Sequence, residues 1–139
     1  MESNIKDTDT ARRNKSALGR AGEIAAARYL EGVGMKILAM NFTAPIGRNR
    51  KNTSVMGEID IIAIDQGSVR FVEVKTRAQV GMLPIEASVT QRKRRNIEKT
   101  AKVFKRIFNL GGRGAGFDVV TVLYGSDTEP EIRLIPDFW

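Results

Sequence analysis

Two runs of β-branched and aromatic residues, 59–64 and 69–74, lie in the middle of the chain and are separated by the short polar segment 65–68. Runs of this length and composition predict β-strands. A short break that contains a glycine predicts a hairpin turn between them. The middle of the chain therefore predicts a pair of antiparallel strands.

The register of this hairpin follows from its turn. If residues 66–67 form a two-residue turn, Asp60 faces Glu73 and Glu58 faces Lys75 at the far end of the hairpin. Because side chains alternate between the two faces of a strand, all four lie on one face. Like charges directly opposite each other are destabilising, so Asp60 and Glu73 need a cationic partner.

A divalent cation is one such partner. Hard cations such as Mg²⁺ bind carboxylate oxygens, and Lys75 projects from the same face as the two carboxylates. Two carboxylates and a lysine can together hold a metal ion and activate water. The alternative is that these charges are simply solvated, with Glu58 and Lys75 forming a surface ion pair that contributes little to stability. The spacing alone leaves both interpretations open.

Further elements are predicted on both sides of the hairpin from periodicity and from glycines that end helices. These are helices at 17–32 and 89–109, strands at 36–43, 116–123 and 132–135, and loops at 44–56 and 76–88. The last four residues, 136–139, include two aromatic side chains and are expected to fold back onto the body.

The first segment, 1–16, is polar and charged, which predicts a disordered leader. Residues 17–139 are then expected to form a single domain, in keeping with a length of 139 residues. The order of helix, three strands, helix and strand predicts an α/β fold, in which helices flank a central mixed β-sheet.

The amino-acid composition limits the kinds of catalytic and metal-binding site that the chain can form. The chain has no cysteine and no histidine, which excludes a disulfide framework, a thiolate metal site and a histidine base. Any metal is therefore expected to be oxygen-bound Mg²⁺ or Mn²⁺. Lys and Arg number 23 against 16 Asp and Glu, a net charge of +7, which suggests a polyanionic partner. The charge alone is also typical of basic proteins that bind nothing in particular.

No apolar run is long enough to span a membrane, and the N-terminus lacks the apolar core of a signal peptide. No membrane association is expected, and a cytoplasmic location is the default prediction.

Several short motifs in the chain resemble those of known protein families. Asp60, followed after twelve residues by Glu73-Val74-Lys75, resembles the D…(D/E)xK signature of restriction-endonuclease-like nucleases. Gly22-Glu23 and the segments 57–60, 71–77 and 117–120 follow in the order seen in the YraN-like family, bacterial proteins predicted to be nucleases. The chain resembles that family over 17–123, and it is also similar to archaeal Holliday-junction resolvases.

The resemblance implies a restriction-endonuclease-like core and metal-dependent hydrolysis of phosphodiester bonds. By it, Asp60, Glu73 and Glu23 would hold one or two Mg²⁺ or Mn²⁺ ions, with the Val74 carbonyl as a further ligand. Lys75 would orient the attacking water or neutralise charge in the transition state.

Six basic residues are candidate contacts to nucleic-acid phosphates. They are Arg77, Lys93, Arg92, Arg48, Arg50 and Lys51. Lys93 lies on the apolar face of the predicted helix 89–109, where it needs a path to solvent or an anionic partner. The loop 44–56 is longer than the family pattern, so its charges could instead belong to a neutral insertion. Asp118, near the start of a strand, is interpreted as a core carboxylate paired with a basic residue.

Three functions are compatible with these features. The first is a metal-dependent endonuclease acting on DNA, with branched and damaged DNA among its candidate substrates and single strands or RNA not excluded. The second is a nucleic-acid-binding module whose nuclease core is silent or needs a partner, and the third is a small protein-interaction domain. No base-reading element is apparent, so backbone recognition is expected. By analogy, a homodimer would suit paired cuts on a branched substrate.

Overall fold

The computed structural model describes residues 2–78, 88–125 and 129–139, with side chains described from residue 16 onward. Its elements, in chain order, are helix α1 (Glu2–Gly32), strands β1 (Lys36–Arg48), β2 (Ser54–Asp65) and β3 (Ser68–Arg77), helix α3 (Gln91–Ile107), and strands β4 (Ala115–Leu123) and β5 (Glu131–Ile135). Most of the predicted loop at 76–88 lies outside the described residues.

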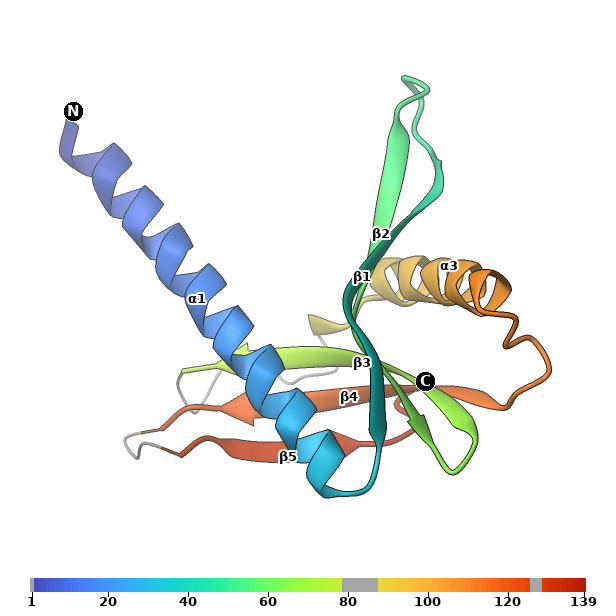
Figure 1. The fold of residues 1–139 in the computed structure, drawn as a ribbon. Helices are drawn as coiled ribbons and strands as arrows, with labels where there is room; N and C mark the ends of the chain where they lie inside the picture. The colour runs from blue at the N-terminus through green and yellow to red at the C-terminus, as the bar shows by residue number, and fades with distance from the viewer. Residues whose placement is uncertain (1, 79–87, 126–128) are drawn as a thin grey trace.

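The five strands form one sheet in the order β1-β2-β3-β4-β5. All neighbouring strands are antiparallel except β3 and β4, which are parallel and are connected through α3. Helices α1 and α3 cover opposite faces of the sheet (Figure 1). The fold class is therefore α/β with a central mixed sheet, as predicted, and it is consistent with a restriction-endonuclease-like core. No helix in the described residues is long and apolar enough to cross a membrane.

Each face of the sheet has its own hydrophobic core. Under α1, the buried residues include Leu30 from the helix and Ile61 and Val72 from the sheet. Under α3, they include Phe71 and Phe104, whose rings meet edge to face at 6.2 Å. Alternation along β3 sends neighbouring side chains to opposite cores, so this strand is buried on both faces, as expected for a strand with a parallel neighbour.

Helix α1 begins at Glu2, so the predicted disordered leader at 1–16 and the predicted helix start at 17 differ from the structure. The segment 2–18 contains neither glycine nor proline, the two strongest helix breakers, which allows the helix to continue upstream of its packed part. In Figure 1 this N-terminal half extends away from the sheet.

The predicted hairpin is confirmed at its turn. Gln66 and Gly67 both have positive φ, 49° and 84°, which is the backbone of a two-residue primed turn. Strands β2 and β3 then pair in the predicted register from Asp65–Ser68 to Ile61–Val72. The ladder does not continue to Asp60 and Glu73, which the sequence predicted to be directly opposed.

The segment 44–56 is not the predicted loop. Strand β1 continues through Pro45 to Arg48 and pairs with β2 as far as Ser54, which leaves only residues 49–53 as a turn. Proline is tolerated there because β1 is an edge strand and needs no donor on its outer side. We call this extension, residues 44–57, the arm; it projects from the sheet beside α3 (Figure 1).

The C-terminal residues fold back onto the body, as predicted, and β5 is the predicted edge strand. Trp139 stacks on Phe117 at 5.0 Å, and its indole nitrogen donates to Glu98 of α3. Arg94 of α3 lies over the rings of both Phe138 and Trp139. The chain end, which follows the edge strand β5, therefore packs against the first turns of α3.

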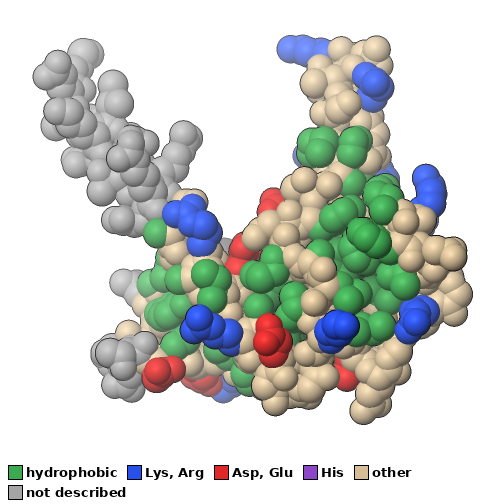
Figure 2. Space-filling view, viewed as in Figure 1, with side chains coloured by type: hydrophobic (Ala, Val, Ile, Leu, Met, Phe, Trp, Pro, Cys, Tyr) green, Lys and Arg blue, Asp and Glu red, His purple; other side chains and the backbone are tan. Residues whose placement is uncertain are grey.

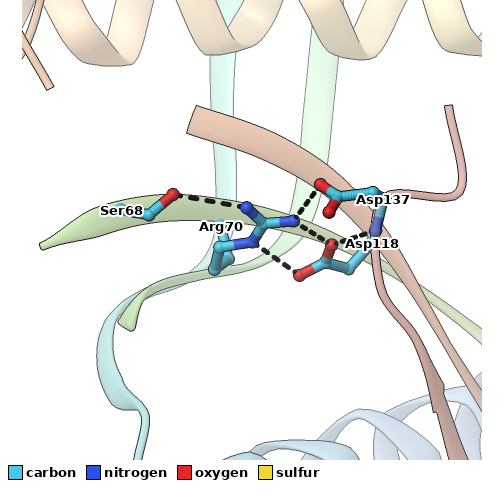
Figure 3. A network of polar contacts seen from close by, with 4 residues as sticks. All are labelled: Ser68, Arg70, Asp118 and Asp137. Carbon is cyan, nitrogen blue, oxygen red and sulfur yellow. Dashed lines mark hydrogen bonds and ion pairs between the residues drawn. The ribbon is translucent and has the colours of Figure 1, made fainter. Parts of the chain in front are cut away.

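Asp118 is fully buried and is paired with a basic residue, as predicted. The partner is Arg70, whose guanidinium donates to both Asp118 oxygens and also to Asp137 at 2.6 Å (Figure 3). The backbone N–H of Asp137 donates to Asp118 at 2.8 Å, and Ser68 accepts from Arg70. We call these four residues the Arg70 cluster.

Candidate active site

The two central strands separate at Asp60. Instead of continuing the ladder, β2 bends away from β3 while it stays paired with β1 (Figure 1), and the Asp60 carboxylate accepts the backbone N–H of Val74 at 2.8 Å. A side-chain oxygen thus takes the place of the backbone carbonyl that a continued ladder would supply. The bend opens the end of the hairpin and holds the Asp60 carboxylate beside β3.

Glu73 lies on β3 next to this opening and is only 5% exposed. One of its oxygens, Oε1, is 2.5 Å from the Lys93 ammonium and 3.5 Å from the Lys75 ammonium. A buried carboxylate is costly unless it is paired, and here two cations from different elements share it. The ammonium of Lys93 stands where another cation could bind Glu73.

Helix α3 brings Lys93 to this place. Thr90 caps the helix, and its hydroxyl accepts the backbone N–H of Lys93 at 3.2 Å. Lys93 lies on the same stripe as the buried residues Ile97, Thr100 and Phe104, so it points along the sheet-facing side of the helix. Of the two predicted possibilities, a path to solvent or an anionic partner, the structure shows an anionic partner, Glu73.

Helix α1 positions Glu23 at the candidate site. Gly22, the preceding residue, lies so close to Thr76 of β3 that a Cβ on Gly22 would overlap the Thr76 hydroxyl. Glycine at position 22 therefore allows close packing of α1 on β3, whereas Gly19 has nothing within 4 Å. Asn41 of β1 is close enough to Glu23 to lower the pKa of this carboxyl group.

The pKa values of the site reflect an excess of buried charge. Burial raises the pKa of Asp60 to about 7, and the negative charge of Glu73 adds to the effect, while the Val74 N–H opposes it. Burial also raises the pKa of Glu23, which Asn41 counteracts and the charges of Glu58 and Glu73 increase. These carboxylates repel one another and lack sufficient positive charge.

The two lysines respond in opposite directions. Burial and the neighbouring Lys93 lower the pKa of Lys75. Burial also opposes the charge of Lys93, but its hydrogen bond and attraction to Glu73 outweigh this and raise its pKa. Lys93 is therefore the cation that neutralises Glu73, and Lys75 is the lysine that most easily loses its proton.

The donor chemistry of the site fits Mg²⁺ or Mn²⁺. Asp60, Glu73 and Glu23 offer only hard oxygen ligands, and the raised pKa of Asp60 shows that added positive charge would be favourable. In the described residues, however, no three carboxylates already form a group arranged to hold a metal ion. Asp60 and Glu73 are thus the core of the candidate site, with Glu23 beside them.

Of the predicted site residues, the structure brings together Asp60, Glu73, Lys75, Glu23 and Lys93. Arg77 ends β3 and lines, with Leu18, Glu23 and Lys75, an open pocket of about 580 Å³ between α1 and β3. The other candidates lie elsewhere. Arg92 is exposed on the first turn of α3, and Arg48, Arg50 and Lys51 are exposed at the tip of the arm. Glu58 faces Thr43 of β1 rather than Lys75.

Sequence reasoning missed Asn41. It has a positive φ of 51° within β1, where asparagine is better tolerated than most residues, and it lowers the pKa of Glu23. The only available signal was a polar residue between Met40 and Phe42 in a strand-like run. Asn41 faces Asp60 across the β1–β2 pair, at the place where β2 bends away from β3.

Three comparisons relate this chain to known proteins. The model of a family described as "Uncharacterised protein family UPF0102" matches residues 22–122. A UPF0102 protein of Trichlorobacter lovleyi is 40% identical over 126 residues, 90% of this chain and 91% of that protein. One from Chlorobaculum parvum is 40% identical over 84% of this chain and 82% of that protein. A solved structure titled "Crystal structure of SSO0001" aligns with a TM-score of 0.45 and 16% identity, over 98% of this chain and 59% of that one.

Proposed function

This chain belongs to the uncharacterised protein family UPF0102, in line with its resemblance to the YraN-like family, and we propose that it is a metal-dependent endonuclease that hydrolyses phosphodiester bonds in DNA. The observation that carries the proposal is the pair of buried carboxylates, Asp60 and Glu73, at the open end of the hairpin. Two lysines on the same carboxylate complete a site suited to a phosphate group.

Each residue of the candidate site has its own role in the proposed reaction. Asp60 and Glu73 supply oxygen ligands, and Glu23 adds a carboxylate from the opposite side of the opening. Lys75, held near Glu73, is placed to orient a water molecule, and its lowered pKa favours exchange of a proton with that water. Lys93 is placed to offset the charge that develops on the phosphate oxygens. In the net reaction water adds across one P–O ester bond, which leaves a phosphate monoester and a hydroxyl.

The chemistry that Mg²⁺ or Mn²⁺ supplies in such a site is Lewis-acid activation of water and stabilisation of phosphate charge.

The test is cleavage of a labelled panel with Mg²⁺ or Mn²⁺: linear duplex, flap, four-way junction, nicked or abasic duplex, single strand and RNA. Wild type is compared with Asp60→Asn, which keeps the size and one acceptor oxygen of the side chain. We expect cleavage to fall roughly a thousandfold or more, since a metal ligand contributes several kcal/mol to the transition state.

The matched control is Asp65→Asn, the same change on the same strand but at the turn. It should cut like wild type. Equal cleavage by wild type and Asp60→Asn would contradict the proposal, as would failure of the wild type to cut any panel member.

A second candidate function is a nucleic-acid-binding module whose nuclease core is silent or needs a partner. It is favoured by Lys93, whose ammonium already neutralises Glu73, and by the lack of a three-carboxylate group in the described residues. Salt-dependent binding without cleavage in any divalent ion would select this function. Lys93→Met distinguishes the two further, because removal of the competing ammonium should strengthen Mg²⁺ binding if the site is a metal site.

DNA as the partner implies a cytoplasmic location. A two-fold homodimer would place two sites for cuts on both strands of a branched substrate. Light scattering of the protein alone and bound to a four-way junction measures this stoichiometry.

A further inference from the structure

The arm is built as a stable projection. Four residue pairs, from Ala44–Gly57 to Arg48–Ser54, continue the β1–β2 ladder beyond the sheet. The turn at its tip is closed by Asn49, whose side-chain oxygen accepts the backbone N–H groups of Lys51 and Thr53. Arg48 donates to the carbonyl of Asn52 at 2.8 Å. These hydrogen bonds hold the backbone of the turn in a defined conformation.

The root of the arm is fixed against α3. A Cβ on Gly57 would overlap the hydroxyl of Thr100, which is fully buried, so the two backbones approach closely there. Thr100 lies seven residues after Lys93 on the same face of the helix, about 10 Å along its axis. The arm therefore starts from the same helix face that positions the lysine at the candidate active site.

The arm carries charge of only one sign. Between Gly32 and Glu58 the chain has no acidic residue, while Arg48, Arg50 and Lys51 are gathered at the tip. In the part of the chain that the structure describes, the side chains of Arg50 and Lys51 make no hydrogen bond or ion pair. Figure 2 shows these basic side chains at the end of a projection that carries no acidic side chain on the visible face.

We propose that the arm is a second nucleic-acid contact, which binds the phosphate backbone of a DNA duplex away from the bond that is cut. This inference rests on the proposed function for the identity of the polyanion. The arm contains no Phe, Tyr or Trp between residues 44 and 57, so it lacks the stacking side chains with which proteins hold single strands. A cationic tip without aromatic residues suits the regularly spaced phosphates of a duplex.

The length of the arm sets the distance between the two contacts. Six residues separate Asp60 from Ser54 along β2, which spans at most roughly 20 Å at about 3.3 Å per residue. Because a DNA strand rises about 3.4 Å per base pair, the tip reaches about six base pairs from the carboxylates. A duplex shorter than this cannot contact both places at once.

The test measures binding of the full chain to fluorescent DNA in EDTA, where metal-dependent cleavage is absent. Wild type and Arg50→Gln/Lys51→Gln are titrated with a duplex of about 24 base pairs, one of about 4 that is closed by a hairpin loop, and a single strand. On the long duplex we expect the variant to bind roughly tenfold more weakly, with a salt slope smaller by about 2. On the short duplex the two proteins should bind alike.

The control is Arg28→Gln/Arg133→Gln, which makes the same change in net charge. Arg28 is exposed on α1, and Arg133 is exposed on β5, the edge of the sheet opposite to β1. This variant should bind the long duplex within about twofold of wild type.

The arm proposal is overturned if Arg50→Gln/Lys51→Gln matches wild type on the long duplex, if its loss equals that of the control, or if the loss is the same on the single strand. None of these outcomes bears on the proposed nuclease activity, because that activity is measured separately by cleavage. Conversely, a loss confined to the long duplex supports the arm even if the wild type cuts nothing.

Discussion

Both ends of the β2–β3 hairpin carry charged residues, but their pKa values are shifted in opposite senses: toward the charged form at the turn end and toward the neutral form at the open end. At the turn end, Arg70 meets Asp118 and Asp137, and hydrogen bonds to these carboxylates raise the pKa of Arg70 further above its ordinary value. At the open end, Asp60 has a raised pKa and Lys75 a lowered one, so both groups are held in their charged forms at a cost. Burial alone does not separate the two ends, because Asp118 and Glu73 are both buried.

The difference lies in how completely each buried charge is matched. In the Arg70 cluster a planar guanidinium pairs with both oxygens of Asp118, and a backbone N–H adds a third bond (Figure 3). At the open end two lysines share one oxygen of Glu73, while Asp60 accepts a single backbone N–H beside the negative charge of Glu73. Groups held in unfavourable charge states are typical of functional sites, whereas fully paired groups are typical of structural ones. The following predictions test that distinction.

The largest expected effect is on catalysis. Lys75→Met should reduce cleavage roughly 10²–10³-fold, as loss of one group that stabilises the transition state does. Stability should stay within about 1 kcal/mol of wild type, because the lost ammonium was opposed by burial and by Lys93. Single-turnover cleavage and urea unfolding measure the two quantities. A stability loss comparable to that of a core mutation would place Lys75 among the structural residues.

The corresponding change at the turn end, Arg70→Met, should cost stability instead. It leaves Asp118 buried without its cation, which typically destabilises a protein by about 3 kcal/mol or more. Chemical denaturation measures the loss. At temperatures where the variant remains folded, the cleavage rate should equal that of wild type, and a large rate defect in the folded variant would contradict the comparison.

A smaller effect is expected at the contact between α1 and β3. Gly22→Ala forces a Cβ against Thr76 and should destabilise by about 1–3 kcal/mol while moving Glu23 away from the site. Gly19→Ala, one turn earlier on the same helix with open space around it, should be neutral or stabilising by up to about 1 kcal/mol. Thermal unfolding of both variants checks this pair. Adding Thr76→Ala to Gly22→Ala should restore part of the loss, since it removes the overlapping hydroxyl.

The last prediction concerns pH. The pKa of Asp60 rises from 3.8 to about 7 on folding, so the native state binds more protons than the unfolded state between these values. Stability is therefore lost as pH rises from about 4 to about 7, and Asp60→Asn should remove this part of the dependence. Urea unfolding near pH 5 and near pH 8 measures it. Mg²⁺ should recover stability of the wild type at the higher pH and leave Asp60→Asn unchanged, a readout independent of cleavage.

Much of the fold could be predicted from local patterns. The turn at Gln66-Gly67 and the alternation along β2 and β3 were sufficient for the register near the turn, because that register depends on residues close in sequence. The place of Asp118 in an apolar strand was sufficient to predict that it pairs with a basic residue. It was not sufficient to identify that residue as Arg70. The segment 44–56 was predicted wrongly because proline, glycine and charge usually indicate loops, while an edge strand with solvent on one side tolerates all three.

The candidate site could be predicted as a set of residues but not as an arrangement. Direct opposition of Asp60 and Glu73 was wrong, since the β2–β3 ladder ends at Ile61–Val72, where β2 bends away from β3 and stays paired with β1 (Figure 1). That bend coincides with Asn41, whose positive φ gave no clear signal in the sequence. Likewise, the need of Lys93 for an anion was predictable, but Glu73 as that anion was not.

The sequence by itself determined most of the elements, the hairpin turn, the excess of positive charge and the residue types of a hard-oxygen site, because these depend on composition and short-range periodicity. Tertiary structure decided which charges meet. Residues from α1, β2, β3 and α3 converge only when both helices pack on the sheet, and burial in that packed state sets the pKa values of Asp60 and Lys75. Contacts between residues far apart in sequence, and the dielectric environment they create, are properties of the whole fold.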